Sequence, residues 1–239
     1  MSPKKFDLIL NKKILPFKKT INVDSDKSIS IRSLLISSIS QGSSLVKNTL
    51  ESDDVLSAIN CLKKLGVKIT KSKRGEYLIS GKGLGSLQIK KYNKLNFGNS
   101  GTLARLLIGI LSTTPNIRVN LSGDHSLNRR NMKQLIELMS QFGAQFNPKN
   151  KFKFPLRLIS SELPIKINYK AGVSAQLKSA VILAGLNSYG NTVISEIERS
   201  RDHTENMLLD NSRVIKIKNK RIKVITIFGK KNLNPLKIN

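Results

Sequence analysis

Two cations stand at the start of a stretch with the pattern of a helix, VDSDKSISIR at residues 23–32, which leads into the apolar run SLLISSISQ. The first turn of a helix carries partial positive charge, so Lys27 and Arg32 are unfavourable there unless an anion binds beside them. Free backbone N–H groups and cationic side chains at a helix start together suit phosphate and carboxylate groups. The stretch therefore predicts an anion-binding site.

This arrangement occurs three times along the chain, at a spacing of about 73 residues. The helical runs SISIRSLL, GTLARLL and SAQLKSAV each carry a cation four positions after their first residue, on the same helical face. The pairs are Ser28 with Arg32, Gly101 with Arg105, and Ser174 with Lys178. A threefold unit of this kind gathers three anion-binding helix starts in one region.

Each of these runs is followed by a turn, a β-like stretch and a second amphipathic run. The second runs, DDVLSAINCLKKLG, SLNRRNMKQLIELMSQFG and DHTENMLLD, each predict one helix, and the first two end in the glycine that a helix C-terminus favours. Asp53, Asp54 and Asp202 stand where caps are expected, and His125 and His203 are expected to be structural. We predict an α/β fold (α+β by some conventions) of three β-α-β-α-β repeats.

The composition limits the classes of function. A chain of 239 residues can form one large domain or two small ones with a substantial core. The formal net charge is +27, but the cations are scattered, aromatic residues make up 5% and tryptophan is absent, so no nucleic-acid partner is expected. Capture of small anionic substrates and a composition rich in Lys, Asn and Ile account for the charge.

The cysteine content and the apolar runs bear on the compartment. One cysteine, Cys61, excludes an intramolecular disulfide, and its place on an apolar helical face predicts a buried side chain rather than a nucleophile. The apolar runs are too short for a membrane span of roughly 18 residues, and MSPKKFDLIL lacks the core of a signal peptide. We expect a soluble, cytoplasmic protein with no membrane partner.

Five motifs carry a resemblance to a known family. In this order, VDSDKSISIRSLL, NFGNSGTLARLL, SGDHSLNRRNM, VSAQLKSAVILAGL and SRDHTENML resemble motifs of the 5-enolpyruvylshikimate-3-phosphate synthases, or 3-phosphoshikimate 1-carboxyvinyltransferases. The resemblance extends from about Leu15 to Lys237. It implies transfer of the enolpyruvyl group of phosphoenolpyruvate to the 5-hydroxyl of shikimate 3-phosphate, with release of phosphate, in chorismate and aromatic amino acid biosynthesis.

The resemblance also implies a fold, ligands and partners. It implies an inside-out α/β barrel lobe, small anionic substrates, no cofactor and no metal, a tetrahedral reaction intermediate, a monomeric full-length enzyme and inhibition by glyphosate. Both substrates carry several negative charges, which is what the cations at the helix starts require.

The resemblance assigns roles to individual residues. Lys27 is expected to lie between the two substrates, to contact both and to act in catalysis. The expected contacts of shikimate 3-phosphate are Lys27, Ser28, Arg32, Ser174, Ala175, Gln176 and Arg201. The expected contacts of phosphoenolpyruvate are Lys27, Gly101, Thr102, Arg130 and Gln176. Arg105 either contacts substrate or braces the site.

The chain departs from the family pattern at two motifs. Asn131 follows Arg130 where the family often has proline, and LLDNSR follows ENM where the family commonly continues with phenylalanine and glycine after a leucine. The first change keeps the arginine but alters the local rigidity. The second change means that the family pattern does not predict the conformation of the turn after that helix.

The family's chains are about twice as long and form two lobes of three repeats each. The expected parts are a segment of the C-terminal lobe at 1–20 with a strand near Phe6–Leu10, an N-terminal lobe at 21–232 with repeats at 21–95, 96–168 and 169–232, and the start of a crossover at 233–239. The C-terminal lobe, which this sequence does not include, carries an aspartate and a lysine for acid–base chemistry. We therefore expect the chain alone to be inactive.

Two alternatives stay open at this point. UDP-N-acetylglucosamine enolpyruvyl transferases share the fold, but they have a lysine-asparagine pair and a loop cysteine, where this chain has Lys27-Ser28 and places Cys61 in a helical run. A non-catalytic module for anions or nucleic acid on the same lobe is the second alternative.

Overall fold

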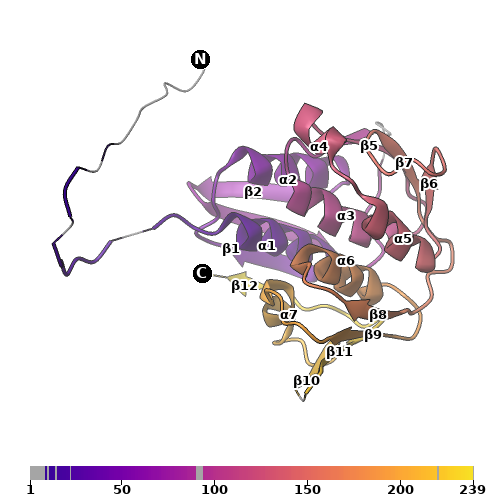
Figure 1. Cartoon of the computed structure of the whole chain (residues 1–239). Helices are drawn as coiled ribbons and strands as arrows, with labels where there is room; N and C mark the ends of the chain where they lie inside the picture. Colours follow the sequence, from indigo (N-terminus) through magenta and orange to yellow (C-terminus); the bar gives the residue numbers. More distant parts are fainter. Residues whose placement is uncertain are drawn as a thin grey trace.

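The computed structural model describes residues 9, 11–13, 15–21, 23–89, 94–219 and 221–238. The expected strand at Phe6–Leu10 lies outside these residues, apart from Ile9. The described part of the chain before Asp26 runs away from the body of the molecule (Figure 1). Its apolar side chains Leu15, Phe17 and Ile21 are exposed.

The strands form three four-stranded sheets, and each sheet comes mostly from one third of the chain. The first has the order β12-β1-β3-β2, with β12 at Lys237–Ile238, β1 at Gln41–Val46, β3 at Glu76–Lys82 and β2 at Lys68–Lys73. The second has the order β4-β5-β7-β6, with β4 at Lys94–Asn96, β5 at Arg118–Ser122, β7 at Leu156–Ile159 and β6 at Gln145–Asn147. The third has the order β10-β11-β9-β8, with β10 at Ile215–Asn219, β11 at Lys223–Phe228, β9 at Asn191–Glu196 and β8 at Asn168–Ala171.

The three sheets share one pairing scheme. Each has a single parallel pair, which joins β1 to β12, β5 to β4 and β9 to β8, and its other pairs are antiparallel. The parallel partner in the first sheet comes from the end of the chain, where Lys237 lies opposite Leu45. The segment 233–239 therefore contributes a strand to this lobe.

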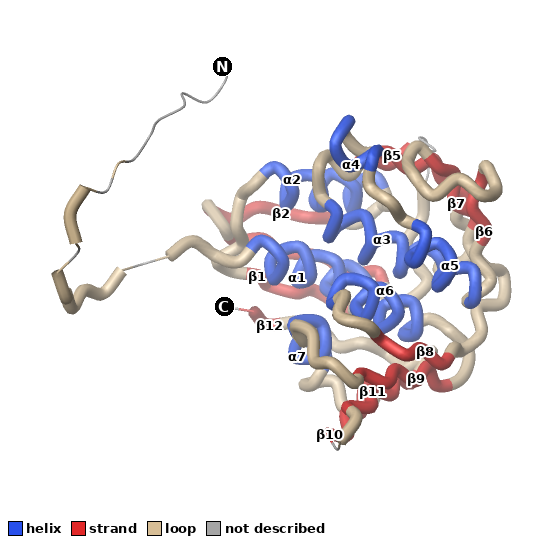
Figure 2. The backbone as a smooth tube through the Cα atoms, in the orientation of Figure 1, coloured by secondary structure: helices blue, strands red, loops and turns tan. Residues whose placement is uncertain are grey.

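Three helices occupy the centre, and the sheets lie around them (Figures 1 and 2). They are α1 at Lys27–Ile39, α3 at Gly101–Thr113 and α6 at Ala175–Leu186. Their side chains are buried almost all round, which is why their sequences are apolar or small on every face. The α/β class is thus confirmed, and the strands of the described residues form three separate sheets rather than a closed barrel.

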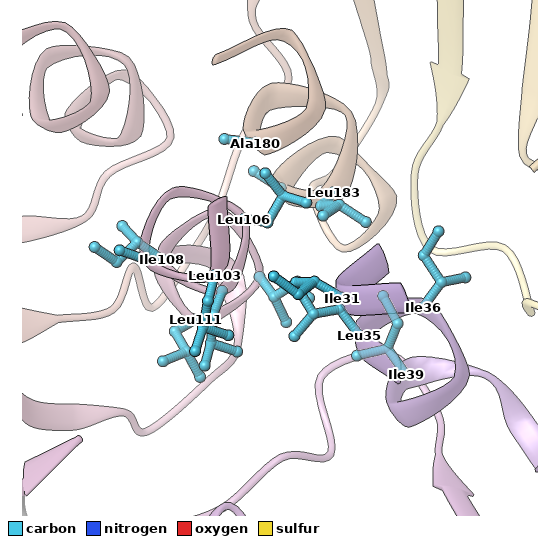
Figure 3. Close-up of a cluster of buried hydrophobic side chains, with 14 of the residues drawn as sticks. Ile31, Leu35, Ile36, Ile39, Leu103, Leu106, Ile108, Leu111, Ala180 and Leu183 are labelled. Carbon is cyan, nitrogen blue, oxygen red and sulfur yellow. The ribbon is translucent and has the colours of Figure 1, made fainter. Parts of the chain in front are cut away.

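The core lies where the three central helices meet. Ile31 and Leu35 of α1 approach Leu106 of α3 and Leu183 of α6 (Figure 3). The helices α3 and α6 cross closely because Gly109 has no side chain: a Cβ there would lie 2.5 Å from the carbonyl oxygen of Ala180. This close packing brings the starts of the central helices together.

Each central helix begins with a side-chain cap. Asp26, Ser100 and Ser174 each accept a hydrogen bond from the backbone N–H three residues later, and they are 74 residues apart in both intervals. The spacing between equivalent helix starts is therefore one residue longer than the expected repeat of about 73 residues. Counted from the caps, the three cations come six, five and four residues later, so they point in different directions. The prediction that Arg32, Arg105 and Lys178 occupy equivalent positions in the three repeats was wrong.

Outer helices connect the strands. They are α2 at Asp53–Lys64, α4 at His125–Arg129, α5 at Lys133–Gln141 and α7 at His203–Leu208. The single helix expected across SLNRRNMKQLIELMSQFG is wrong, because Arg130 is extended (φ −69°, ψ 137°) and separates α4 from α5. The expected glycine ends are confirmed: Gly66 and Gly143 follow α2 and α5 with φ of +83° and +94°. None of the helices in the described part of the chain has the length and hydrophobicity of a membrane span.

Candidate anion-binding site

A cavity of about 250 Å³ opens at the starts of the three central helices. It is lined by Lys27, Asp54, Asn99, Gly101, Thr102, Arg130 and Gln176. Lys27 is the first residue of α1, Gly101 and Thr102 begin α3, and Gln176 is the second residue of α6. The structure thus brings together all five residues that were expected to contact phosphoenolpyruvate. We refer to this space as the helix-start cavity.

Lys27 is already paired in this cavity. Its Nζ lies 2.7 Å from Oδ2 of Asp54, which belongs to the first turn of α2. The cap of α2 is Ser52, so the expectation that Asp53 and Asp54 cap this helix was wrong. The Lys27 side chain keeps 48% of its surface exposed, whereas Asp54 keeps 17%. The ammonium group can therefore turn toward a ligand more readily than the carboxylate can leave.

Gly101 leaves room for two guanidinium groups. A Cβ on Gly101 would lie 2.8 Å from Nη1 of Arg130 and 2.9 Å from Nη1 of Arg105. Arg130 is fixed from the other side, because its Nη2 donates to Oδ1 of Asn99 at 2.8 Å. The pKa of Arg105 is lowered, first by burial and then by the charge of Arg130. Two cations that crowd one point favour an anion between them.

A chain of hydrogen bonds fixes the orientation of the side-chain amide of Gln176. Nη1 of Arg105 donates to Oε1 of Gln176 at 2.9 Å and to the carbonyl oxygen of Gly101 at 3.2 Å. Nε2 of Gln176 in turn donates to Oγ1 of Thr102 at 3.0 Å. Arg105 therefore braces the helix starts of α3 and α6, which is one of the two roles that the sequence left open.

Arg32 faces the protein interior. Its Nε donates to Oγ1 of Thr204 at 2.9 Å and its Nη2 to Oγ of Ser179 at 3.2 Å, and the residue is 3% exposed. Burial lowers its pKa; Glu205 opposes this shift and the nearby Arg201 adds to it. Ser179 also donates to the carbonyl oxygen of Ala175, so Arg32 is linked to the start of α6.

Three buried charges and one partly buried charge lie behind Arg32. Nζ of Lys178 is 2.7 Å from Oε1 of Glu196 and 2.7 Å from Oε1 of Glu205, and all three side chains are 0% exposed. Lys223 approaches the same carboxylates at 3.7 and 3.5 Å. We call these four residues the buried charge cluster. Lys178 is therefore neutralised inside the lobe and is not the third anion-binding cation that the repeat suggested.

The buried charge cluster also anchors the segment that carries Arg201. Oε1 of Glu196 accepts hydrogen bonds from the backbone N–H and the hydroxyl of Ser200, at 2.8 and 2.7 Å. Arg201 follows directly and is exposed. Burial raises the pKa of Glu196, and hydrogen bonds from Lys178 and Ser200 outweigh this effect and hold it below its usual value.

The other residues expected to bind shikimate 3-phosphate lie around the helix starts. Ser174 caps α6, Ala175 is its first residue, and the carbonyl oxygen of Ser28 accepts from Arg32 at 3.0 Å. A second cavity of about 380 Å³ adjoins the first, because both include Gln176. Its lining is Arg105, Asn131, Met132, Lys133, Gln134, Leu135, Ser174, Gln176 and Leu177.

Three polar residues outside these cavities were expected to be structural. Cys61 is buried on α2, and its thiol, whose pKa burial raises to about 12, donates to the carbonyl oxygen of Asn96. His125 and His203 are the first residues of α4 and α7. No group of three or more possible metal ligands occurs among the residues that the structure describes.

Sequence reasoning missed the partners of the cations. Asp54, Asn99, Ser179 and Thr204 each hold a site cation by a direct contact. Asn99 could have been noticed, since it stands two residues before Gly101 in a quoted motif. The other three come from elements far from their partners along the chain, and no local spacing marks them.

The architecture and the cavity define an α/β lobe with a cation-lined cavity at its central helix starts. Comparisons with known proteins identify its family. The family model for EPSP synthase (3-phosphoshikimate 1-carboxyvinyltransferase) matches residues 12–239. A 3-phosphoshikimate 1-carboxyvinyltransferase of Sulfurihydrogenibium sp. is 39% identical over 232 residues, which are 95% of this chain and 53% of that protein. One of Syntrophomonas wolfei is 39% identical over 83% of this chain and 46% of its own length.

The structural comparison agrees. The EPSP synthase of Acinetobacter baumannii superposes with a TM-score of 0.81 and 34% identity, over 90% of this chain and 48% of that one. The chain belongs to the EPSP synthase family. It spans about half the length of the curated relatives that it matches.

Proposed function

We propose that this chain forms one lobe of an enzyme that transfers the enolpyruvyl group from phosphoenolpyruvate to the 5-hydroxyl of shikimate 3-phosphate. The observation that carries the proposal is the helix-start cavity, which gathers Lys27, Gly101, Thr102, Arg130 and Gln176 from separate thirds of the chain. The family acts on small anionic substrates, and the lining of this cavity has the cations that such substrates need.

The two substrates would share the helix starts. Lys27 and Arg130 would hold the phosphate and carboxylate of phosphoenolpyruvate, with the amide of Gln176 and the hydroxyl of Thr102 beside them. Shikimate 3-phosphate would lie against Ser28, Arg32, Ser174, Ala175 and Arg201. Lys27 would then stand between the two substrates and neutralise charge on both.

The reaction would be an addition followed by an elimination. The 5-hydroxyl oxygen adds to C2 of phosphoenolpyruvate and loses its proton, while C3 gains a proton. The tetrahedral intermediate then loses a proton from C3 and releases phosphate, which leaves an enol ether. Lys27 and Arg130 would stabilise the negative charge of the departing phosphate. The proton transfers are assigned to an aspartate and a lysine of a second lobe.

The division of the chain is part of this proposal. The lobe would comprise 21–232 in three repeats at 21–95, 96–168 and 169–232, while 1–20 would belong to the second lobe. The segment 233–239 would lead to that lobe after β12 has completed the first sheet. Strand β4 crosses the first internal boundary, and β8 begins at the second. A monomeric full-length enzyme in the cytoplasm remains a prediction.

The first test measures binding by the 239-residue chain with isothermal titration calorimetry. Shikimate 3-phosphate should bind, because Ser28, Arg32, Ser174, Gln176 and Arg201 are all present. Arg201→Ala should weaken this binding by at least tenfold, since a charge-assisted contact contributes about 1.5–3 kcal/mol. Arg221→Ala, which removes another exposed cation, after β10, is the matched control and should have no effect. Binding of UDP-N-acetylglucosamine in place of shikimate 3-phosphate would contradict the proposal.

The second test restores the reaction. The chain alone should show no turnover. Mixing it with the separately produced C-terminal half of a relative should yield phosphate release from phosphoenolpyruvate and shikimate 3-phosphate. Lys27→Ala should abolish that activity, because Lys27 stands between both substrates. Turnover by the chain alone, or a restored activity that does not need Lys27, would refute this assignment.

A further inference from the structure

A carboxylate lies inside the cavity that is built for anions. Asp54 lines the helix-start cavity together with Lys27 and Arg130, and its Oδ2 is 2.7 Å from Nζ of Lys27. A negative charge at this place repels any phosphate or carboxylate that enters. It also occupies the cation that the ligand needs. No step of the proposed reaction has used this residue.

The position of Asp54 is held from both sides. The loop that leads into α2 is tied to α1, because the backbone N–H of Leu50 donates to Oγ of Ser30 at 3.0 Å. The next residue, Glu51, accepts hydrogen bonds from Lys71, from the backbone N–H of Gly75 and from the hydroxyl of Tyr77, each at 2.9 Å. These contacts keep the start of α2 beside the start of α1, so Asp54 cannot move away with its loop.

Lys27 is the mobile partner of the pair. Its side chain is 48% exposed against 17% for Asp54, and a lysine carries its charge on a flexible stem of four carbons. We propose that Asp54 is an internal counter-ion, which holds Lys27 in the ligand-free lobe and competes with the anionic ligand for it. Binding then requires Lys27 to exchange the carboxylate for the ligand. The inference rests on the proposed function for the class of ligand, a small anion with phosphate and carboxylate groups.

The counter-ion lowers the affinity of the cavity for anions. With Asp54 ionised, the charges of Lys27, Arg130 and Asp54 sum to one positive charge, and without it they sum to two. One unit charge at roughly 6 Å from the ligand, with an effective dielectric constant of about 40, changes the affinity by about tenfold. Part of the change requires Lys27, because the ligand must take its ammonium group from Asp54. Asp54→Asn keeps the size of the side chain and removes its charge.

The experiment uses the 239-residue chain with phosphoenolpyruvate as the probe and follows binding by phosphorus NMR, which also detects weak complexes. Asp54→Asn should lower Kd by about tenfold. Asp53→Asn is the matched control: it removes the same charge from the neighbouring residue, which is exposed and pairs with no cation among the residues that the structure describes, and Kd should stay within twofold. Asp54→Glu keeps the charge and should not tighten binding.

A double-mutant cycle tests the competition itself. Lys27→Met should weaken binding, and adding Asp54→Asn to it should give a smaller gain than in the wild-type background, because no ammonium group is left to release. If binding depends on Lys27 but Asp54→Asn leaves it unchanged or weakens it, Asp54 is not a counter-ion that competes with the ligand. The proposed function would then still stand. If neither the wild-type chain nor any variant binds phosphoenolpyruvate, the helix-start cavity is not the ligand site, and the proposed role of Asp54 is refuted as well.

Discussion

Nη1 of Arg105 lies 2.9 Å from Oε1 of Gln176, and this contact joins the second turn of α3 to the first turn of α6. The same nitrogen donates to the carbonyl oxygen of Gly101, so one guanidinium group fixes a backbone and a side chain of the helix-start cavity. We therefore expect Arg105 to act on the ligand through Gln176.

Arg105→Ala should therefore weaken phosphoenolpyruvate and shikimate 3-phosphate together, each by about tenfold, because Gln176 is expected to contact both. Calorimetry on the 239-residue chain measures both affinities. Arg105→Lys keeps the charge but replaces the rigid planar guanidinium group by an ammonium group on a flexible stem, so it should recover part of the loss. Arg118→Ala, at an exposed site on β5, is the control. Full recovery by lysine would mean that the charge matters and the positioning does not.

Gly101→Ala should act mainly on one substrate. The added methyl group meets Nη1 of both Arg130 and Arg105 below 3.0 Å, and these flexible side chains must move. We expect the affinity for phosphoenolpyruvate to fall by about tenfold, because the methyl group enters its cavity and displaces Arg130, and the affinity for shikimate 3-phosphate to fall less, because only the shift of Arg105 reaches it through Gln176.

The free energy of unfolding of Gly101→Ala should stay the same or rise slightly, since Gly101 lies in the first turn of α3 and alanine favours a helix. Urea unfolding measures this free energy. Equal losses of both ligands would show that Gly101 has a structural role only.

Lys178→Met should destabilise the lobe by about 3–5 kcal/mol, because it leaves Glu196 and Glu205 buried without their nearest cation. Urea unfolding measures the change. Lys216→Met, at an exposed position of β10, should stay within about 0.5 kcal/mol. A loss below 1 kcal/mol for Lys178→Met would mean that Lys223 compensates for it.

Glu51 should make the lobe sensitive to acid. Hydrogen bonds from Lys71, Gly75 and Tyr77 lower its pKa from 4.5 to about 2. A lowered pKa in the folded state stabilises the fold above the unfolded value, and that contribution is lost as the pH falls from 4.5 toward 2. Glu51→Gln should flatten the pH dependence of the free energy of unfolding in this window, and it should lower that free energy near neutral pH, where the ionised Glu51 contributes in full. An unaltered slope between these pH values would contradict the assignment.

Much of the scaffold could be read from the sequence, because it depends on local spacing. The apolar runs after Asp26, Ser100 and Ser174 predicted the three central helices, and the glycines after α2 and α5 marked their ends. The five motifs identified the family, and they contain every residue that lines the helix-start cavity except Asp54.

The directions of the charged side chains were decided by the tertiary structure. A shift of one residue along a helix turns a side chain by about 100°. Arg32, Arg105 and Lys178, which looked equivalent, therefore contact different partners: the hydroxyl groups of Thr204 and Ser179, the side chain of Gln176, and the two carboxylates of the buried charge cluster. The pair between Lys27 and Asp54 and the strand that the chain end adds to the first sheet join segments far apart in sequence. Such contacts arise only when the three sheets close around the central helices, and no local pattern encodes them.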